Sequence, residues 1–161
     1  MDAFLETALF SHVGVPTIAV RLVAAAVLAA IIGLEREWND HAAGFRSHIL
    51  VCVAAASFAL ITIELVHAPV FGDGNIRMDP MRLVEAVTAG VAFLAAGFIV
   101  LLKGEVRGVT TGAGLWLAGA TGLACGLGLF AIAILATIVG FATLRLLHIV
   151  ERKIVRGREG R

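Results

Sequence analysis

The chain has 161 residues, of which 60% are hydrophobic and only 16% are charged, and its formal net charge is +1. A mean hydropathy of +0.97 excludes a water-soluble domain of this size and indicates a protein that lives in a bilayer. The length leaves room for five membrane spans, short loops and two tails, but for no separate soluble domain of ordinary size.

The apolar runs predict five helices that cross the membrane. They lie at 17–34, 47–66, 82–102, 109–126 and 127–147, and each is close to the roughly 20 residues that a spanning helix needs. The runs are continuously apolar, whereas barrel strands alternate. Pro16 suits a first helical turn, and Asp79 before Pro80 suits a capped start of the third helix. Gly126 and Gly128 predict a tight turn before the fifth. We therefore expect an all-α fold, a polytopic transmembrane bundle with five spans.

Basic residues near the span ends predict the orientation. With five spans, the first loop, the third loop and the C-terminal tail share one side, which holds ten of the thirteen Lys and Arg residues. The positive-inside rule makes that side cytoplasmic. Residues 1–16 are then an N-terminal periplasmic segment that does not resemble a cleaved signal peptide, and 148–161 are a basic cytoplasmic tail. So short a tail suits lipid headgroups and predicts no nucleic-acid partner.

Four charged residues are predicted to share the outer leaflet, two of each sign. They are Arg21, Glu64, Arg82 and Glu85. Facing lipid, each would cost a few kcal/mol, so we expect an intramembrane polar cluster in which they neutralise one another. A structural ion-paired clamp and a binding or transit site for an ion both remain open.

The predicted cytoplasmic end collects a second polar set. It comprises Glu35, Arg36, Glu37, Asp40, His41, Arg46, Ser47, His48, Lys103, Glu105, Arg107, Thr110 and Thr111. No spacing here matches a metal motif, and Arg36 separates two of the acids, so a solvated, salt-bridged loop is favoured over a metal site. Arg46 and His48 could hold a carboxylate, a phosphate headgroup or a partner's acid. Thr110 and Thr111 suit a helix cap, and no nucleophile has a base at usable spacing, so we expect neither an enzyme nor a cofactor.

Small residues recur every four positions and predict where helices touch. Gly114, Ala118, Gly122 and Gly126 form one such stripe, Ala25, Ala29 and Gly33 another, and Ala86 with Gly90 a third. In lipid such stripes let backbones approach closely. We assign helix packing to Gly33, Gly90, Gly97, Gly114 and Gly122, and a homodimer on one stripe remains open.

Several motifs in a fixed order resemble the MgtC/SapB family of bacterial inner-membrane proteins. They are RL at 21–22, IGLER at 32–36, AGFRSHILV at 43–51, DPMR at 79–82, FLAAG at 93–97 and VRGVTTGA at 106–113, followed by Leu115-Trp116 and Gly122. The resemblance implies family positions at Glu35, Arg36, Gly44, Arg46, His48, Arg82, Arg107, Thr110 and Thr111. Ala92 and Ala95 stand where relatives commonly carry glycine, and Glu85 where an uncharged amide is expected.

The resemblance implies a non-enzymatic protein associated with magnesium limitation and membrane energetics. Well-studied relatives are held to act on the proton-driven ATP synthase or other membrane complexes, so we expect interaction with other membrane proteins. A small oligomeric ion transporter or channel is the alternative. The sequence shows no inverted repeat of the kind that carriers use. The chain stops soon after the fifth predicted span, which is expected of a short form without the family's C-terminal cytosolic domain.

Overall fold

The computed structural model describes residues 11–67, 79–102 and 104–159, with side chains up to Leu146. In that part of the chain it forms five helices and one short hairpin. The helices are α2 (Val15–Trp38), α3 (Phe45–Val66), α4 (Pro80–Ala96), α5 (Val109–Gly126) and α6 (Phe130–Glu159), and the strands are β1 (Val100–Leu102) and β2 (Glu105–Arg107). The expectation of an all-α protein with five helices is confirmed.

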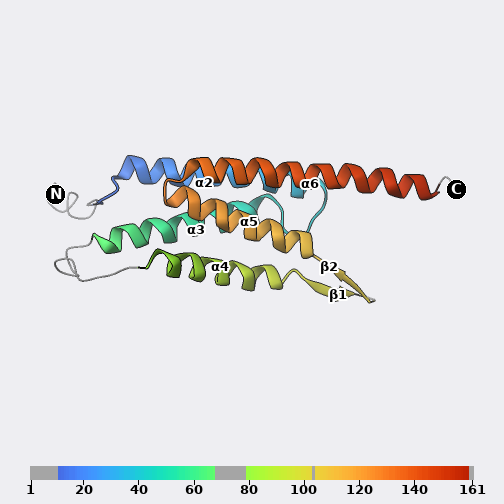
Figure 1. The fold of residues 1–161 in the computed structure, drawn as a ribbon, viewed down its shortest axis with the longest axis horizontal. Coiled ribbons are helices and arrows are strands. Elements are labelled where there is room, and N and C mark those ends of the chain that lie inside the picture. Colours follow the sequence, from blue (N-terminus) through green and yellow to red (C-terminus); the bar gives the residue numbers. More distant parts are fainter. Residues whose placement is uncertain (1–10, 68–78, 103, 160–161) are drawn as a thin grey trace.

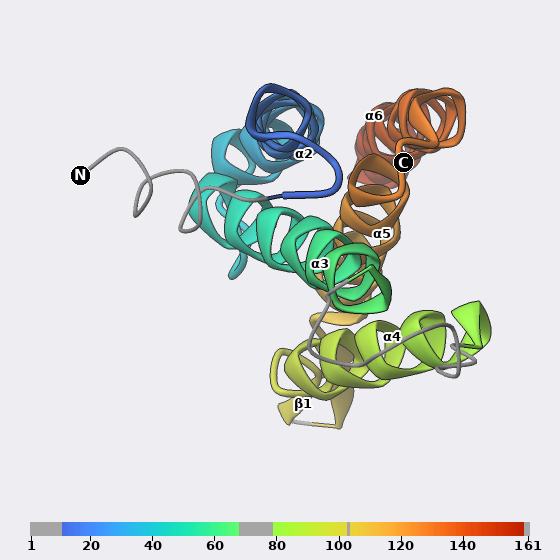
Figure 2. The ribbon, with the colours of Figure 1, turned by 90° about the vertical axis from the view of Figure 1, so that its left-hand side faces the viewer.

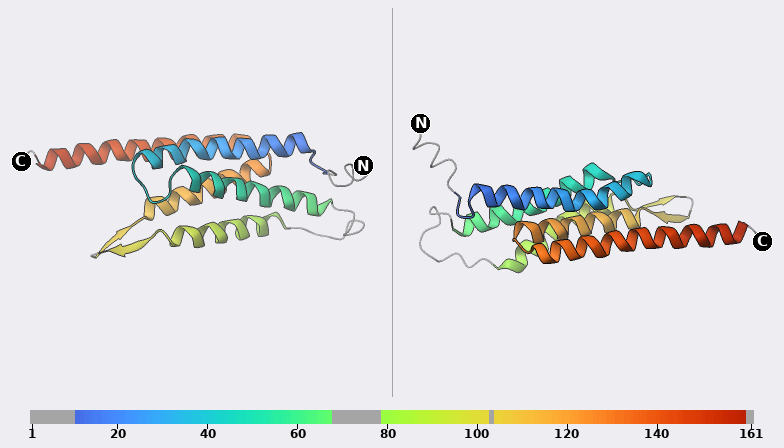
Figure 3. Two further views of the ribbon diagram at one scale, coloured as in Figure 1. Left: turned by 180° about the vertical axis from the view of Figure 1, so that it is seen from behind. Right: turned by 90° about the horizontal axis from the view of Figure 1, so that it is seen from above.

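Successive helices run in opposite directions along the long axis of the molecule (Figure 1). The connection from α2 to α3 and the β1–β2 hairpin lie together at one end, here called the hairpin end. The start of α2 and the turn from α5 to α6 lie at the other, here called the turn end. The hairpin and the last part of α6 extend beyond the other helices at the hairpin end (Figure 3).

Local sequence signals start and stop these helices as expected. Pro16 lies in the first turn of α2, and the Asp79 side chain caps α4 by accepting a hydrogen bond from the Met81 backbone N at 2.9 Å. The turn after α5 places Gly128 at φ +80°, a left-handed conformation that glycine adopts without strain. Gly126 is the last residue of α5, so Gly128 alone supplies the predicted backbone freedom.

The third predicted span, 82–102, is wrong at its C-terminal end. Helix α4 ends at Ala96, and the remaining apolar residues form β1, which pairs antiparallel with β2 so that Val100 faces Arg107. Seventeen residues make a helix of about 25 Å, shorter than the ~30 Å hydrocarbon core. A short apolar run does not reveal by hydropathy whether it is helix or strand. Here Gly104 and Gly108, both at positive φ, permit the hairpin.

Two of the described helices, α2 and α3, are long and apolar enough by length and composition to cross a membrane. Residues 130–146 of α6 form a shorter apolar helix. Many large apolar side chains on these elements are exposed, among them Val23, Leu50 and Leu135 at 61–69%. Exposed apolar surface of this extent is typical of helices that face lipid.

Helix α5 forms the centre of the bundle, with 12 of its 18 residues buried. In the end-on view α3 and α5 lie in the middle, with α2 and α6 on one side and α4 on the other (Figure 2). The core is built from small side chains and includes Ala25, Ala29, Cys52, Ala118 and Cys125, all fully buried. Small residues let helix backbones approach one another where lipid provides no hydrophobic driving force.

Candidate functional site

The last turns of α2 carry a buried ion pair. Glu35 and Arg36 are only 2% and 3% exposed, and Arg36 Nε lies 3.4 Å from Glu35 Oε2. Glu35 Oε1 accepts a hydrogen bond of 2.9 Å from Asn39 Nδ2, which also donates to the Glu35 carbonyl at 2.7 Å. The expected solvated loop is therefore wrong for Glu35 and Arg36, because α2 continues one turn past its apolar run and carries both side chains into the bundle.

His48 adds a fully buried imidazole from the first turns of α3. Its Nδ1 lies 2.8 Å from the Gly44 carbonyl oxygen. A carbonyl only accepts, so Nδ1 carries the proton and Nε2 of the neutral ring is an acceptor. Both Arg36 and Glu35 lie close enough to interact electrostatically with this ring. We call Glu35, Arg36 and His48 the buried polar cluster.

Three glycines let the helices close around this cluster. A Cβ on Gly33 would lie 2.8 Å from Phe45 Cα, and a Cβ on Gly114 would lie 3.0 Å from His48 Nε2. A Cβ on Gly44 would overlap the carboxylate of Glu37, whose Oε2 accepts from the Phe45 backbone N at 2.9 Å. These contacts lock the α2–α3 connection against α5, so the predicted motif residues at 33, 44, 48 and 114 meet in space.

The buried polar cluster has both a donor and an acceptor to spare. Arg36 Nε and Glu35 Oε2 contact each other in the ion pair, but Arg36 Nη1 and His48 Nε2 are buried with no hydrogen-bond partner among the described residues. Each such atom costs about 1–3 kcal/mol unless it is paired. A spare donor beside a spare acceptor matches a small species that both accepts and donates, such as water, better than a bare cation, which the guanidinium would repel. Within the described chain, no group of three or more His, Cys, Asp or Glu residues could hold a metal ion.

The other predicted residues of this end divide into buried and exposed positions. Arg46 is exposed on α3, and Arg107 is exposed on β2, where its Nη2 lies 3.3 Å from Glu105 Oε2. Thr111 is buried at 4% exposure, whereas Thr110 is exposed. Neither threonine caps α5, because the N-cap is Gly108 at φ +87° and both threonines lie inside the helix. That expectation was wrong.

The four charged residues expected to neutralise one another at the turn end do not pair with one another. Arg21 Nη1 instead donates to the Gly126 carbonyl at 2.7 Å, where it compensates the C-terminus of α5. Glu64 accepts from Ser11 Oγ, His12 N and Val13 N at 2.5, 2.8 and 3.0 Å. Arg82 and Glu85 are exposed on α4. The residues share one end of the bundle, as predicted, but helix rotation aims their side chains at different partners.

Only some of the glycines assigned to helix packing lie at close helix contacts. A Cβ on Gly122 would overlap the carbonyl oxygen of Cys52, so α5 touches α3 backbone to backbone there. A Cβ on Gly90 would meet nothing within 4 Å, and Gly97 is the C-cap of α4. Gly90 and Gly97 therefore do not mark close helix contacts. Ala95, one of the departures from the family pattern, packs against Gly112 of α5, whose Cβ would lie 3.4 Å from Ala95 Cβ.

Several contacts that hold these sites in place were not predicted from the sequence. Asn39, the C-cap of α2, lies four residues after Glu35, a spacing at which side chains on a helix meet, so a signal existed. Nothing in the sequence indicated that Glu37 caps α3, or that Glu64 holds the segment before α2. The rings of His12 and His67 stack beside that segment with centroids 3.6 Å apart.

Apolar helices that alternate in direction around a core of small residues define a helical membrane protein. The sequence model of the MgtC family matches residues 22–153, and the chain belongs to that family. Together, family and apolar helices place it among bacterial membrane proteins. No solved structure matches the chain.

Three relatives illustrate the likeness. YhiD of Escherichia coli K12 is 30% identical over 129 residues, 80% of this chain and 60% of YhiD. An uncharacterized protein of Haemophilus influenzae is 33% identical over 137 residues, 84% of this chain and 58% of that protein. Protein MgtC of Salmonella typhimurium LT2 is 37% identical over 118 residues, 73% of this chain and 47% of MgtC. The chain thus spans about half to three fifths of the length of these relatives.

Proposed function

We propose that the chain is a non-enzymatic, multi-pass protein of the bacterial inner membrane that contributes to magnesium and ion homeostasis by contacting other membrane proteins. The five helices cross the bilayer, with the N-terminus outside and the hairpin end and the C-terminus in the cytoplasm. The alternating helix directions (Figure 1) and the basic residues of the loops at the hairpin end support this orientation. The lipid bilayer is the first partner of such a bundle.

The closed interior of the bundle is the observation that carries this proposal. Between the buried polar cluster and Arg21 at the turn end lie Ala25, Ala29 and Cys52, all fully buried. A Cβ on Gly122 would already overlap the α3 backbone at this level. An ion crossing a single bundle would lose its hydration in this closely packed, mostly apolar segment, which costs far more than the segment can return. The interior therefore supports a protein that acts through its surfaces.

The hairpin end offers the surface for those contacts. Arg46 and Arg107 are exposed there, and an arginine holds a carboxylate or phosphate with two parallel hydrogen bonds. Glu37 and Gly44 fix the first turn of α3, which carries Arg46. We assign recognition to the exposed arginines, and we assign their support to the buried polar cluster. Thr110 and Thr111, at the start of α5, belong to the same recognition end.

The alternative is a small oligomeric ion transporter or channel, and the name of the Escherichia coli relative YhiD refers to magnesium transport. Purified protein in sealed vesicles, loaded with a magnesium-sensitive or a pH-sensitive dye, distinguishes the two. We expect no flux above that of protein-free vesicles, with an ionophore as the positive control. Flux that Arg36→Gln abolishes and Arg145→Gln leaves intact would establish the alternative and reject the proposal.

Crosslinking in the native membrane tests the contacts themselves. A photo-reactive residue at position 46 or 107 is expected to capture a discrete protein, whereas one at the lipid-facing position 93, where Phe93 is 82% exposed, is not. An adduct of twice the chain mass at positions 46 and 107 identifies a homodimer as the contact. Equal capture at all three positions, or none at 46 and 107, contradicts a recognition surface at the hairpin end.

A further inference from the structure

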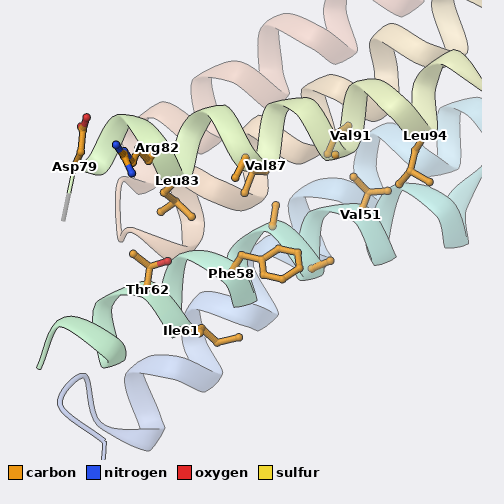
Figure 4. Close-up of a pocket in the computed structure, with 14 residues that line it drawn as sticks. Val51, Phe58, Ile61, Thr62, Asp79, Arg82, Leu83, Val87, Val91 and Leu94 are labelled. Carbon is orange, nitrogen blue, oxygen red and sulfur yellow. The ribbon is translucent and has the colours of Figure 1, made fainter. Parts of the chain in front are cut away.

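A groove runs along the outside of the bundle between α3 and α4, with a volume of about 860 Å³ (Figure 4). Its walls are mostly apolar and include Val51, Phe58 and Ile61 from α3 and Leu83, Val87 and Leu94 from α4. Polar groups gather at one end only, where Thr62, Asp79 and Arg82 lie. We call this space the lateral groove.

The groove exists because α4 packs on α5 and stands away from α3. Val91 Cγ2 would lie 2.8 Å from a Cβ on Gly119 of α5. On the groove side α4 presents Ala86 and Gly90, and α3 presents Ala54, all too small to fill the gap. A Cβ on Gly90 would meet nothing within 4 Å. The small side chains of both helices therefore create the lateral groove.

The polar end of the groove carries one carboxylate and one guanidinium, and within the described chain only the carboxylate is hydrogen-bonded. The Asp79 carboxylate accepts from the Met81 backbone N at 2.9 Å and so is engaged as the cap of α4. The Arg82 side chain is exposed and makes no ion pair or hydrogen bond with the described part of the chain. It extends from the first turn of α4, where the helix dipole also favours an anion. An apolar channel that begins at an exposed guanidinium complements an amphiphile with an anionic head.

We propose that the lateral groove binds a membrane phospholipid with an anionic headgroup, whose phosphate contacts Arg82 and whose acyl chain lies between α3 and α4. This inference rests on the proposed crossing of the membrane by α4. From Arg82 to Leu94 the helix rises about 18 Å, close to the ~15 Å of one hydrocarbon leaflet. The groove therefore holds an acyl chain at the depth that the chain already occupies in the bilayer.

The charged end of the groove favours an anionic lipid over an apolar helix from another protein or from a second copy. Such a helix would bring no acidic group to the Arg82 guanidinium. A second groove, between α4, α5 and α6, has a volume of about 530 Å³ and no charged lining residue, so it provides no headgroup contact.

Native mass spectrometry of the purified chain, titrated with phosphatidylglycerol or phosphatidylcholine, tests the headgroup contact. We expect the anionic lipid to bind with an affinity about tenfold higher, because both lipids carry the phosphate but the choline ammonium of phosphatidylcholine repels the Arg82 guanidinium. Arg82→Gln should remove this preference, whereas Arg145→Gln, which removes another exposed arginine near the opposite end, should retain it. Equal binding of the two lipids, or an undiminished preference in Arg82→Gln, overturns the proposal.

Filling the groove tests the acyl chain separately. Gly90→Leu should lower the binding of both lipids several-fold, whereas Ala89→Leu, on the exposed side of α4 and outside the groove, should not. Unchanged binding in Gly90→Leu, or a second copy crosslinked into the groove, rejects a lipid occupant. The flux and crosslinking results do not depend on this lipid, so the proposed function and this inference fail separately.

Discussion

One substitution made at two glycines should change stability in opposite directions. Gly122 lies where α5 touches α3, and a Cβ there would overlap the Cys52 carbonyl oxygen. Gly90 lies on α4 beside the lateral groove, and a Cβ there would meet nothing within 4 Å. Gly122→Ala and Gly90→Ala therefore add the same methyl group to a closed helix contact and to open space.

Two contributions, helix propensity and overpacking, set the expected changes in the free energy of unfolding. Replacing glycine by alanine in a helix gains up to about 1 kcal/mol of intrinsic propensity at either site. Overpacking a tight contact costs about 1–3 kcal/mol, and the upper value applies at Gly122 because the obstacle is backbone that cannot rotate away. We expect Gly122→Ala to lose about 2 kcal/mol and Gly90→Ala to gain up to about 1 kcal/mol, a difference of roughly 3 kcal/mol.

Equilibrium unfolding in mixed micelles measures the free energy of unfolding of each variant. The micelles are titrated with a denaturing detergent, and unfolding is followed by the fluorescence of Trp38 and Trp116. The wild-type protein and each variant are compared in the same micelle, so that the lipid-like environment cancels. If Gly122→Ala were as stable as wild type, or if both variants shifted in the same direction by the same amount, the backbone contact between α3 and α5 would be refuted.

Three further predictions concern polar contacts. Arg36→Met leaves the buried carboxylate of Glu35 without its ion-pair partner and should lower the free energy of unfolding by about 3–5 kcal/mol. Adding Glu35→Gln should restore much of this loss, and additive losses in the same unfolding assay would contradict the buried pair. Arg21→Met removes the bond to the Gly126 carbonyl at the end of α5 and should cost about 1–2 kcal/mol, while an unchanged free energy of unfolding would exclude this contact. Glu64→Gln weakens three hydrogen bonds and should make the segment before α2 more sensitive to limited proteolysis, with equal cleavage rates as the opposing result.

The sequence predicted which residues form the candidate site, but it did not predict that they are buried. The family motifs and the alternation of spans brought Glu35, Arg36, Gly44 and His48 to one end, and the structure joins them there. Charged residues that follow an apolar run are typical of a solvated loop, yet the structure buries the first two. Their burial depends on Gly33 and Gly114, which let α3 and α5 approach the last turns of α2.

Hydropathy and spacing along the chain determined the number, order and direction of the helices, because these depend on residues that are close in sequence. The break in the third apolar run escaped this reasoning, since strand and helix bury the same kinds of side chains. Only the tertiary structure decided which polar groups meet. Arg21 bonds the carbonyl of a residue 105 positions away, and Glu64 holds the segment before α2, because the rotation and crossing of packed helices decide where each side chain points.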